Sequence, residues 1–432
     1  MALGLCLAAV VAPPAAASSG FSFSRIRGID RYATAAGVAV AGFPSGAGTA
    51  ILATGDDFPD ALAGAFLAGS YGAPILLTEP SAMPPATAQA LTALNVHRVV
   101  VLGGTLAVSA DQVSALSREG YQVARIAGQS RYDTMAAIAE QPGTSVGTDA
   151  QGRPTAILAT GTTFPDALAA GALSGARRLP ILLTPGTSRL GTQAAAALVQ
   201  LHIGHVLIVG GTAAVSASVA AQVQGMGIAT TRLAGHDRSA TAAAVAQREV
   251  SSWGLSSSGF VVARGDAFPD ALGGAALAVA LEEPLLLTAS PLDPGSALTY
   301  ASDHGSGLSG AAAVGGVCAL AGTTLDALAV AAGGPLGPPS PLCGPYASGI
   351  PPSLAADFAS LRRCESSGDY RADTGNGYYG AYQFSAATWR DVGYAGLPDE
   401  ASPGVQDQAA YRLYLVDGWA PWPTCGAALG GP

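Results

Sequence analysis

Short apolar runs alternate with alanine-rich segments along most of the chain. Residues 50–53, 75–77 and 99–102 are apolar at every position, a pattern typical of strands that are buried on both faces. The alanine-rich stretches 61–69 and 86–94 separate these runs and predict helices. Because strands that alternate with helices pair in parallel through right-handed crossovers, we expect small three-layer α/β domains with parallel sheets.

The whole pattern occurs three times. A Phe-Pro-Asp-Ala-Leu segment begins at Phe58, Phe164 and Phe268, so the copies are separated by 106 and then 104 residues. Each copy continues with a Pro-x-Leu-Leu-Thr strand, and a later apolar strand ends in two glycines. A fixed period of this length indicates tandem repeats of one structural unit. The three predicted repeat domains cover residues 25–124, 125–231 and 232–332.

The Pro-Asp pairs and the double glycines have a structural explanation. Proline suits the first position of a helix, and a carboxylate there favours the positive end of the helix dipole. A glycine pair after a strand can also cradle phosphate, but no copy has GxGxxG or a P-loop lysine. The acidic pair Asp56-Asp57 becomes Thr162-Thr163 in the second copy. We therefore predict that the repeats are not themselves enzymes.

Composition and charge narrow the class of protein. The 432 residues are 49% hydrophobic and 11% charged, which predicts folded domains rather than disorder. A net charge of −9 without a basic cluster argues against nucleic-acid binding. No run of 18 apolar residues occurs, so we expect no membrane span. The apolar N-terminus with small residues near 15–18 predicts a signal peptide over 1–17, and a flexible apolar tail is the alternative.

A Gly- and Pro-rich segment, 333–352, follows the third copy and predicts a semi-rigid linker. An even number of cysteines remains after the predicted signal peptide, which in an exported protein indicates two disulfides. These cysteines are Cys318, Cys343, Cys364 and Cys425. Cys343 lies in the linker, and a bond to Cys318 would tie the linker to the third copy. Two free thiols are the alternative.

Residues 353–432 form a small domain rich in aromatic residues. A domain of this size needs a staple, and Cys364 and Cys425 bracket most of it. We expect an amphipathic helix over 356–364 with Glu365 at its end, and a hairpin or loop at a cleft edge over 373–380. A carboxyl group at a helix end that faces aromatic rings can have a raised pKa and act as a general acid. The aromatic rings suit either a carbohydrate groove or the core.

The repeats also share an Arg-x-x-Gly-x-x-Arg-Tyr segment, whose second arginine is Arg31, Arg131 or Arg238. Together with the motifs above, it resembles the type 2 cell-wall-binding repeat of Gram-positive surface proteins over residues 25–330. The resemblance implies topoisomerase-primase-type α/β domains that pack in a pseudo-threefold trimer. It also implies noncovalent binding to an anionic secondary polymer of the cell wall.

Arg31, Arg131 and Arg238 are the candidate polymer-binding residues, because a guanidinium can make bidentate contacts with a phosphate or carboxylate. An ion pair at the interface with a neighbouring repeat is the alternative. The third copy departs from the pattern, with Ser239 in place of Tyr and Arg264 in place of Thr.

Five motifs of the C-terminal domain carry a second resemblance. They are Cys-Glu-Ser-x-Gly at 364–368, Thr-Gly-Asn-Gly-Tyr-Tyr-Gly at 374–380, Gln-Phe at 383–384, Thr-Trp at 388–389 and Trp-Pro-x-Cys-Gly at 422–426. Residues 353–430 thereby resemble the resuscitation-promoting factor family, a transglycosylase-like branch of the lysozyme superfamily. The resemblance implies a small lysozyme-like α+β domain stapled by a Cys364–Cys425 disulfide, with Glu365 as the single essential acid.

The same resemblance places Thr388 in the substrate groove, with Gln383 and Trp389 beside it. Tyr379 and Asn376 of the loop complete the set of candidate substrate-binding residues. The chain departs from the family pattern at three positions near the acid, which are Ser367, Tyr370 and Asp373.

We therefore expect a secreted, wall-anchored muralytic enzyme of a Gram-positive-type bacterium, a glycosidase or lytic transglycosylase that acts on the glycan strand of peptidoglycan. Its expected partners are peptidoglycan and an anionic secondary wall polymer. No cofactor is expected, and no metal, because the five histidines are scattered and the cysteines lack CxxC spacing. The alternative is a surface-layer or adhesion protein that only binds the wall. Glu365 separates the two, since a pure binding module needs no acid.

Overall fold

The computed structural model describes residues 20–58, 60–186 and 188–429, so the predicted signal peptide over 1–17 lies outside the described residues. The chain divides into two compact units. The first consists of Ser24–Ala289 and Gly310–Gly315, and the second contains Ser290–Ser309 and residues 316–429. No helix in the described ranges has the length and apolar character required to cross a membrane.

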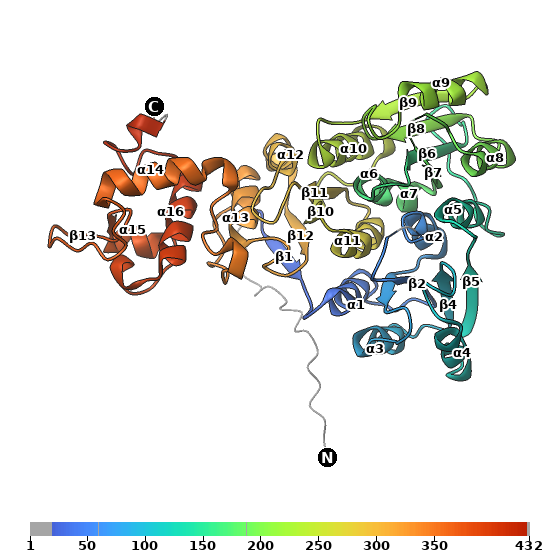
Figure 1. The fold of residues 1–432 in the computed structure, drawn as a ribbon, viewed down its shortest axis with the longest axis horizontal. Helices are drawn as coiled ribbons and strands as arrows, with labels where there is room; N and C mark the ends of the chain where they lie inside the picture. The colour runs from blue at the N-terminus through green and yellow to red at the C-terminus, as the bar shows by residue number, and fades with distance from the viewer. Residues whose placement is uncertain (1–19, 59, 187, 430–432) are drawn as a thin grey trace, which may run out of the picture. The chain divides into compact units, whose positions relative to one another are not determined.

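The first unit contains three four-stranded sheets, one for each repeat (Figure 1). Their strands pair in parallel, as the alternation of apolar runs and helices predicts; in the first sheet, for example, Ile51 lies opposite Ile75 and Val100. The strands of the first repeat are β2 (Thr49–Thr54), β3 (Ile75–Thr78), β4 (Arg98–Leu102) and β5 (Gln122–Ile126). Those of the second are β6 (Thr155–Thr160), β7 (Ile181–Thr184), β8 (His205–Val209) and β9 (Ala229–Leu233). The third sheet consists of β10 (Gly259–Arg264), β11 (Leu285–Thr288), β12 (Gly310–Val314) and β1 (Phe23–Ile26).

Helices follow the strands in each repeat. In the first repeat they are α1 (Arg31–Gly42), α2 (Gly64–Tyr71), α3 (Pro85–Ala93) and α4 (Ala110–Arg118). In the second they are α5 (Arg131–Ala139), α6 (Pro165–Ala169), α7 (Gly171–Arg177), α8 (Thr192–Gln200) and α9 (Ala217–Gly225). In the third they are α10 (Arg238–Trp253), α11 (Phe268–Leu281), α12 (Ser296–His304) and α13 (Gly322–Ala331), with the short 3-10 helix η1 (Gly305–Gly307) after α12. α12 and α13 belong to the second compact unit.

The fourth strand of each sheet was not expected from the apolar pattern. The sheet orders are β3-β2-β4-β5, β7-β6-β8-β9 and β11-β10-β12-β1. β5 and β9 run across the predicted domain boundaries at 124/125 and 231/232. In the third sheet the N-terminal β1 takes the position that β5 and β9 have in the others, and the amide of Gly315 donates a hydrogen bond to the carbonyl of Ile26 at 2.9 Å. The N-terminal strand therefore completes the last repeat.

The first helix of each repeat begins at the Arg-x-x-Gly-x-x-Arg segment, where a polar side chain caps it. The Asp30 carboxylate accepts a hydrogen bond from the amide of Ala33, and the Asp237 carboxylate does the same for Ala240. The Ser130 hydroxyl caps α5 through the amide of Asp133. Such caps satisfy amides that have no partner inside the helix.

The double glycines make room for the Asp of the Phe-Pro-Asp segment. Gly103 has φ +94°, and a Cβ on it would lie 2.5 Å from Oδ2 of Asp60. Gly210 has φ +110°, and its Cβ would lie 2.4 Å from Oδ2 of Asp166. Only glycine combines this backbone conformation with the absence of a side chain. The geometry agrees with a structural role for these glycines.

The helix expected over 61–69 begins later than predicted. α2 starts at Gly64, so Asp60 lies in the turn before it, and Pro59 lies outside the described residues. In the second repeat, Pro165 opens the short α6 as predicted, and the helix is then broken before α7. The third repeat has one continuous helix, α11. The helix-dipole explanation for the Pro-Asp pair thus fits the second and third copies but not the first.

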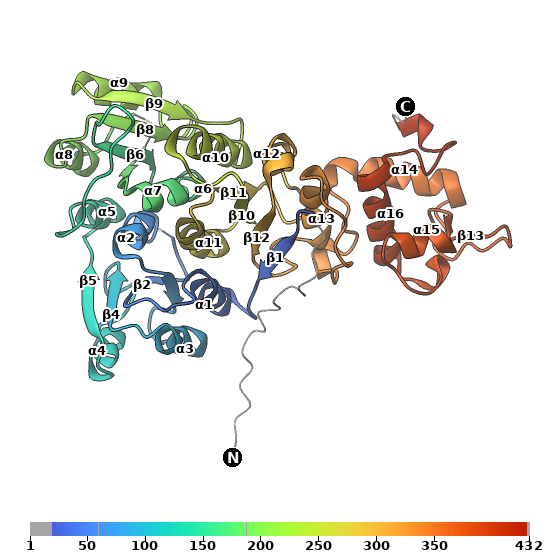
Figure 2. The same cartoon turned by 180° about the vertical axis from the view of Figure 1, so that it is seen from behind.

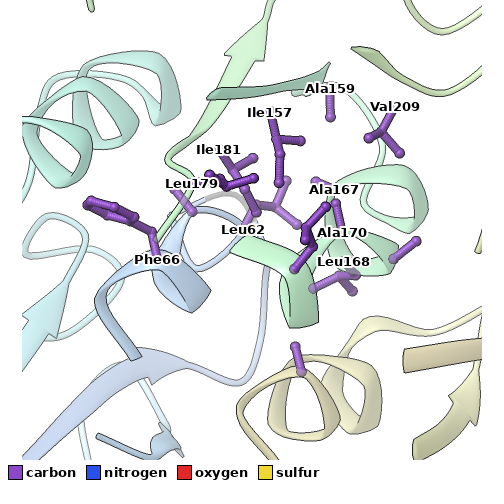
Figure 3. Close-up of a cluster of buried hydrophobic side chains, with 14 of the residues drawn as sticks. Leu62, Phe66, Ile157, Ala159, Ala167, Leu168, Ala170, Leu179, Ile181 and Val209 are labelled. Atoms are coloured by element: carbon purple, nitrogen blue, oxygen red, sulfur yellow. The ribbon is translucent and has the colours of Figure 1, made fainter. Parts of the chain in front are cut away.

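The three repeats share one core around α2, α7 and α11, which pack against one another in pairs (Figures 1 and 2). A Cβ on Gly69 of α2 would lie 1.9 Å from the carbonyl oxygen of Gly175 of α7, so these helices are in backbone contact. Figure 3 shows Leu62 and Phe66 of the first repeat in the same cluster as Ile157 and Ile181 of the second. The structure confirms three parallel-sheet α/β repeats, and their central helices pack in one shared core.

The C-terminal domain is mainly helical and has one short antiparallel hairpin. The helices are α14 (Ala355–Ser366), α15 (Ala386–Asp391) and α16 (Pro403–Asp417), and the hairpin pairs β13 (Tyr378–Tyr379) with β14 (Phe384–Ser385). Three 3-10 helices, η3 (Pro352–Leu354), η4 (Pro398–Glu400) and η5 (Ala427–Leu429), connect or end these elements. Its core is strongly aromatic, with Phe358, Tyr382, Trp389 and Trp422 buried.

Both predicted disulfides are present. Cys364 is bonded to Cys425, and Cys318 is bonded to Cys343. The linker contains the 3-10 helix η2 (Gly344–Tyr346) and also makes a hydrogen bond with α13. The hydroxyl of Thr323 in α13 donates to the carbonyl of Gly349, at 2.7 Å. Residues 333–352 are therefore tied down by side chains within the second unit.

Candidate functional site

Glu365 lies in the last turn of α14, one residue before the helix ends at Ser366. The helix extends two residues further than the sequence pattern predicted. It is terminated by Ser367, which has φ +60°. Glu365 is half-buried, and this burial raises the pKa of its carboxyl group above the usual value. The adjacent Cys364 joins this turn to Cys425 near the C-terminus. A carboxylic acid in this setting keeps its proton at a higher pH than an exposed glutamate does.

The loop after α14 presents polar and aromatic groups to solvent. Asn376 is exposed, and its side-chain oxygen accepts a hydrogen bond from the amide of Tyr378 at 2.9 Å. Tyr378 is 50% exposed, although the sequence analysis did not single it out. Its neighbour Tyr379 is half-buried and forms an isolated bridge with Asp373. The loop therefore offers an accessible aromatic face of the kind on which sugar rings stack.

Thr388 and Gln383 are both half-buried on short elements next to the hairpin. The Thr388 hydroxyl lies 2.9 Å from the hydroxyl of Ser385, and Ser385 also caps α15. Gln383 has φ +51° and donates from its side-chain nitrogen to the carbonyl of Gly380 at 3.0 Å. Thr388 is thus bonded to Ser385 of β14, and Gln383 is bonded to Gly380, which directly follows Tyr379.

Trp389 does not fit the predicted role in substrate binding. Its side chain is fully buried, its ring nitrogen donates to the carbonyl of Ala395, and its ring packs against Phe384 and Tyr394. A residue in this position supports the groove from the core and does not touch a ligand. The Thr-Trp motif therefore contains one core residue, Trp389, next to the half-buried Thr388.

The two nearby aspartates are each used in a turn. Oδ1 of Asp369 accepts from the amide of Arg371 at 2.8 Å, and Oδ1 of Asp373 accepts from the amide of Gly375 at 2.9 Å. Both side chains are otherwise exposed. Within the described residues, no group of three or more His, Cys, Asp or Glu side chains is arranged to hold a metal ion.

The repeat arginines converge on an aromatic cluster formed by Phe58, Phe164 and Phe268. The ring centroids lie 5.4, 5.9 and 6.2 Å apart in pairs. The guanidinium of Arg31 lies 6.0 Å from the ring centroid of Phe268, and that of Arg131 lies 5.6 Å from that of Phe58. Each of these arginines thus contacts the Phe of another repeat.

The arginines are also held by backbone carbonyls. Nη1 of Arg131 donates to Gly161 at 2.7 Å and Nη1 of Arg238 donates to Gly265 at 2.9 Å, while Arg31 makes the same bond to Gly55. Arg31 and Arg238 are exposed and Arg131 is half-buried. The geometry combines an interface contact, in the form of cation–π stacking, with a solvent-facing cation.

Half-buried carboxyl groups follow two of these phenylalanines in the Phe-Pro-Asp segments. Burial raises the pKa of Asp166 to about 6, against the opposing attraction of Arg238. Burial likewise raises the pKa of Asp270 to about 6, against Arg264 and Arg31. Both carboxyl groups therefore keep their protons to a higher pH than an exposed aspartate does.

In the third copy, Ser239 stands in place of the tyrosine and makes a different hydrogen bond. Tyr32 in the first copy donates to Asp56 at 3.1 Å, whereas the buried Ser239 at the equivalent position bonds to Asp237. Arg264 forms a paired contact with Asp266, with nitrogen–oxygen distances of 2.7 and 2.8 Å. The extra cation of this copy is neutralised within its own turn.

A second set of arginines, the first in each Arg-x-x-Gly-x-x-Arg segment, was not predicted from the sequence to have a role. Arg125 donates to the carbonyls of Gly103 and Gly104, and Arg232 and Arg25 donate to Gly210 and Gly315. Their signal was the fixed spacing of six residues from the second arginine. They hold the glycine turns and so shape the same end of each sheet.

Comparison with known proteins finds two family models that match different parts of the chain. The family model described as cell wall binding domain 2 (CWB2) matches residues 25–113, 125–220 and 232–324. The model described as transglycosylase-like domain matches residues 353–425.

The relatives each share part of the chain. The resuscitation-promoting factor RpfC of Mycobacterium tuberculosis is 47% identical over 76 residues, which is 18% of this chain and 54% of the relative. The N-acetylmuramoyl-L-alanine amidase LytC of Bacillus subtilis is 30% identical over 186 residues, or 43% of this chain and 36% of the relative. The chain spans about a third to a half of the length of these curated relatives. The structure of Cwp6 from Clostridium difficile shares the fold, with a TM-score of 0.63 and 23% identity over 75% of this chain and 50% of that one.

Proposed function

Because the chain belongs to the cell wall binding domain 2 family and ends in a transglycosylase-like domain, we propose that it is a wall-anchored enzyme that cleaves the glycan strand of peptidoglycan. The observation that carries the proposal is Glu365, a half-buried acid with a raised pKa at the end of α14, next to the disulfide to Cys425. The exposed Tyr378 and Asn376 and the half-buried Thr388, Gln383 and Tyr379 supply the glycan-binding surface.

In the proposed reaction Glu365 acts first as acid and then as base. The protonated carboxyl gives its proton to the glycosidic oxygen, and the bond from that oxygen to the anomeric carbon of a muramic acid residue breaks. The 6-hydroxyl of the same sugar then adds to the anomeric carbon and returns a proton to the carboxylate. One carboxyl group is therefore sufficient for both proton transfers, and the product has a 1,6-anhydro end. The turn-capping roles of Asp369 and Asp373 support a single acid over a two-carboxylate mechanism.

The repeats serve as the anchor in this proposal. Arg31 and Arg131 contact the Phe58–Phe164–Phe268 cluster, and Arg238 has the equivalent position in the third repeat. The exposed guanidinium groups of Arg31 and Arg238, together with that of the half-buried Arg131, suit phosphate or carboxylate groups of an anionic secondary wall polymer. Three equivalent contacts on one module add avidity to weak individual sites. The two disulfides support secretion, since such bonds persist outside the cytoplasm. We propose the wall of a Gram-positive-type bacterium as the location.

The decisive experiment incubates purified walls with the protein and with Glu365→Gln. We expect the variant to lose at least about 100-fold in the release of soluble fragments, because a general acid contributes about that much. Folding and wall binding should be unchanged, since Gln keeps the shape of the side chain. Asp373→Asn is the matched control and should keep most activity.

Four outcomes would change the proposal. An inactive Asp373→Asn protein would restore a two-carboxylate mechanism, and muramic ends that are only reducing in mass spectra would indicate hydrolysis. A wild-type protein that binds walls but releases nothing would favour the adhesion protein. Equal binding to walls stripped of secondary polymer would remove the arginine cluster from the anchor.

A further inference from the structure

Two adjacent buried polar residues, Gln406 and Asp407, lie near the start of α16. They are 0% and 8% exposed. Oδ1 of Asp407 accepts hydrogen bonds from the hydroxyls of Tyr370 and Tyr382, each at 2.7 Å, and from Nη1 of Arg362 at 3.1 Å. Nη1 of Arg362 also donates to the Tyr382 hydroxyl at 2.6 Å. A buried carboxylate oxygen that accepts from three donors belongs to a network that is rigid and costly to rearrange.

Gln406 makes a second set of contacts on the same side of α16. Its side-chain oxygen accepts from the amide of Ala381 at 2.9 Å, and its side-chain nitrogen donates to the carbonyl of Tyr370 at 2.8 Å. It packs so closely that a Cβ on Gly380 would lie 2.3 Å from its oxygen. The backbone on either side of residues 371–380 is therefore bonded to one side chain.

The two sets of contacts join the loop to the helix that carries the acid. Residues 371–380 contain Asn376, Tyr378 and Tyr379, and both flanks of this loop are bonded to α16. Arg362 lies one turn before Glu365 on α14, and the Ser366 hydroxyl donates to the carbonyl of Ala381 at 3.0 Å. The loop and the helix that carries Glu365 are thus both hydrogen-bonded to α16, the flanks of the loop through Gln406 and Asp407 and the helix through Asp407.

We propose that Gln406 and Asp407 are positioning residues for the cleft, and that Tyr370 is the link by which Asp407 holds the glycan-binding loop. The inference rests on the proposed function of this cleft. Holding the loop before the substrate arrives lowers the entropy lost on binding, and small displacements of a binding group from its productive position are costly.

The test removes one hydroxyl and keeps everything else. Tyr370→Phe deletes the bond to Asp407 and retains the ring that lies 5.7 Å from the Arg362 guanidinium. The chain offers a matched control in Tyr394, whose hydroxyl donates to the side chain of Gln408 at 2.6 Å, one residue further along α16. Tyr394→Phe deletes an equivalent phenol bond to the same helix and leaves both flanks of the loop untouched.

Two measurements separate positioning from general stability. Hydrogen–deuterium exchange at residues 373–379 should accelerate about tenfold in Tyr370→Phe and not in Tyr394→Phe, a factor that corresponds to the loss of one hydrogen bond to a charged group. With soluble peptidoglycan oligomers, Tyr370→Phe should raise KM about tenfold with a much smaller change in kcat, because the loop binds the glycan while Glu365 stays in place.

The outcomes are distinguishable from a failure of the proposed function. Accelerated exchange confined to Tyr370→Phe supports the positioning role even if the wild-type protein cleaves no glycan, which would refute only the enzyme. Equal exchange and equal KM in the two variants would overturn the positioning role even if the enzyme is active. An unchanged loop in Tyr370→Phe together with a lowered melting temperature in both variants would assign Tyr370 to stability alone.

Discussion

Glu249 is a carboxylic acid buried where the second and third repeats meet. It lies on α10 and is 0% exposed, and one of its oxygens accepts a hydrogen bond from the amide of Leu173 in α7 at 3.0 Å. The other oxygen has no hydrogen-bond partner in the part of the chain that the structure describes. Burial raises the pKa of Glu249 to about 8, against the opposing effects of the Leu173 amide and Arg177. The group therefore favours its protonated form in the folded protein.

This residue makes stability depend on pH. Its folded pKa of about 8 lies above the ordinary value of 4.5, so the folded state holds an extra proton between these values, and stability falls as pH rises through that window. Glu249→Gln imitates the protonated acid. We expect it to be nearly neutral at pH 4.5 and to stabilise the first unit at pH 8 by several kcal/mol, on the order of 1.4 kcal/mol per pKa unit.

Melting curves of both proteins at several pH values test this prediction. The control is Glu119→Gln, an exposed glutamate directly after α4 in the first repeat, which should not change the pH profile. Parallel pH profiles for the wild type and Glu249→Gln would show that Glu249 is ionised in the folded protein.

Residues of this kind mark the limit of sequence-based prediction. The position of Glu365 at the end of a helix was predictable from the pattern around it, and the paired cysteines were predictable because they are few. Glu249 and Asp407 were not, since nothing in a helix sequence says which carboxylate will meet another element. Trp389 was misassigned for the same reason: a motif gives the identity of a side chain but not the direction in which it points.

At the scale of elements, α13 differs from the equivalent helices of the first two repeats. α4 buries only Gln112 and Leu116, whereas α13 is buried at every residue from Gly322 to Ala329. Within the second unit α13 packs against α16. Asp326 of α13 pairs there with Arg412 of α16, whose guanidinium also donates to the carbonyls of Val392 and Gly337. The last helix of the third repeat is thus part of the second unit's core.

We predict that Asp326→Ala destabilises the second unit by about 3–5 kcal/mol, because it leaves a buried guanidinium without its carboxylate. Asp391→Ala, at an exposed position on α15, is the control and should change stability by less than about 0.5 kcal/mol. The double replacement Asp326→Leu with Arg412→Met should recover much of the loss, since it removes both charges. Calorimetry of the full chain measures the stability of all three variants. An Asp326→Ala protein as stable as the wild type would contradict a stabilising role of the Asp326–Arg412 ion pair.

The elements themselves were predictable to different degrees. β2, β3 and β4 follow directly from continuous apolar runs, and α3 was placed to within one residue. β5 was missed because its exposed edge position gives it mixed polarity. The pairing of β1 with β12 was beyond local patterns, since it joins segments whose residues are 287 and 290 positions apart.

For the molecule as a whole, we predict that the first unit requires β1. Deleting residues 20–26 would leave β12 as an uncovered edge strand, and such edges lower stability and promote association. The melting temperature should fall and light scattering should rise. A synthetic peptide covering 20–30 should reverse both effects by adding the missing strand, whereas a scrambled peptide should not. A deletion protein that melts like the wild type would show that β1 is dispensable.

The position of β1 also imposes an order in time. A chain that emerges N-terminus first presents residues 23–26 before anything else in the module, yet their partners follow only after nearly 290 further residues. Contacts between such distant segments form late and slow the approach to the native state. β1 therefore stays unpaired until β12 has been synthesised, which happens after the first two repeats. The third sheet is complete only when Gly315 has emerged. A chain that is interrupted earlier leaves both β1 and β10 without β12, the strand that lies between them.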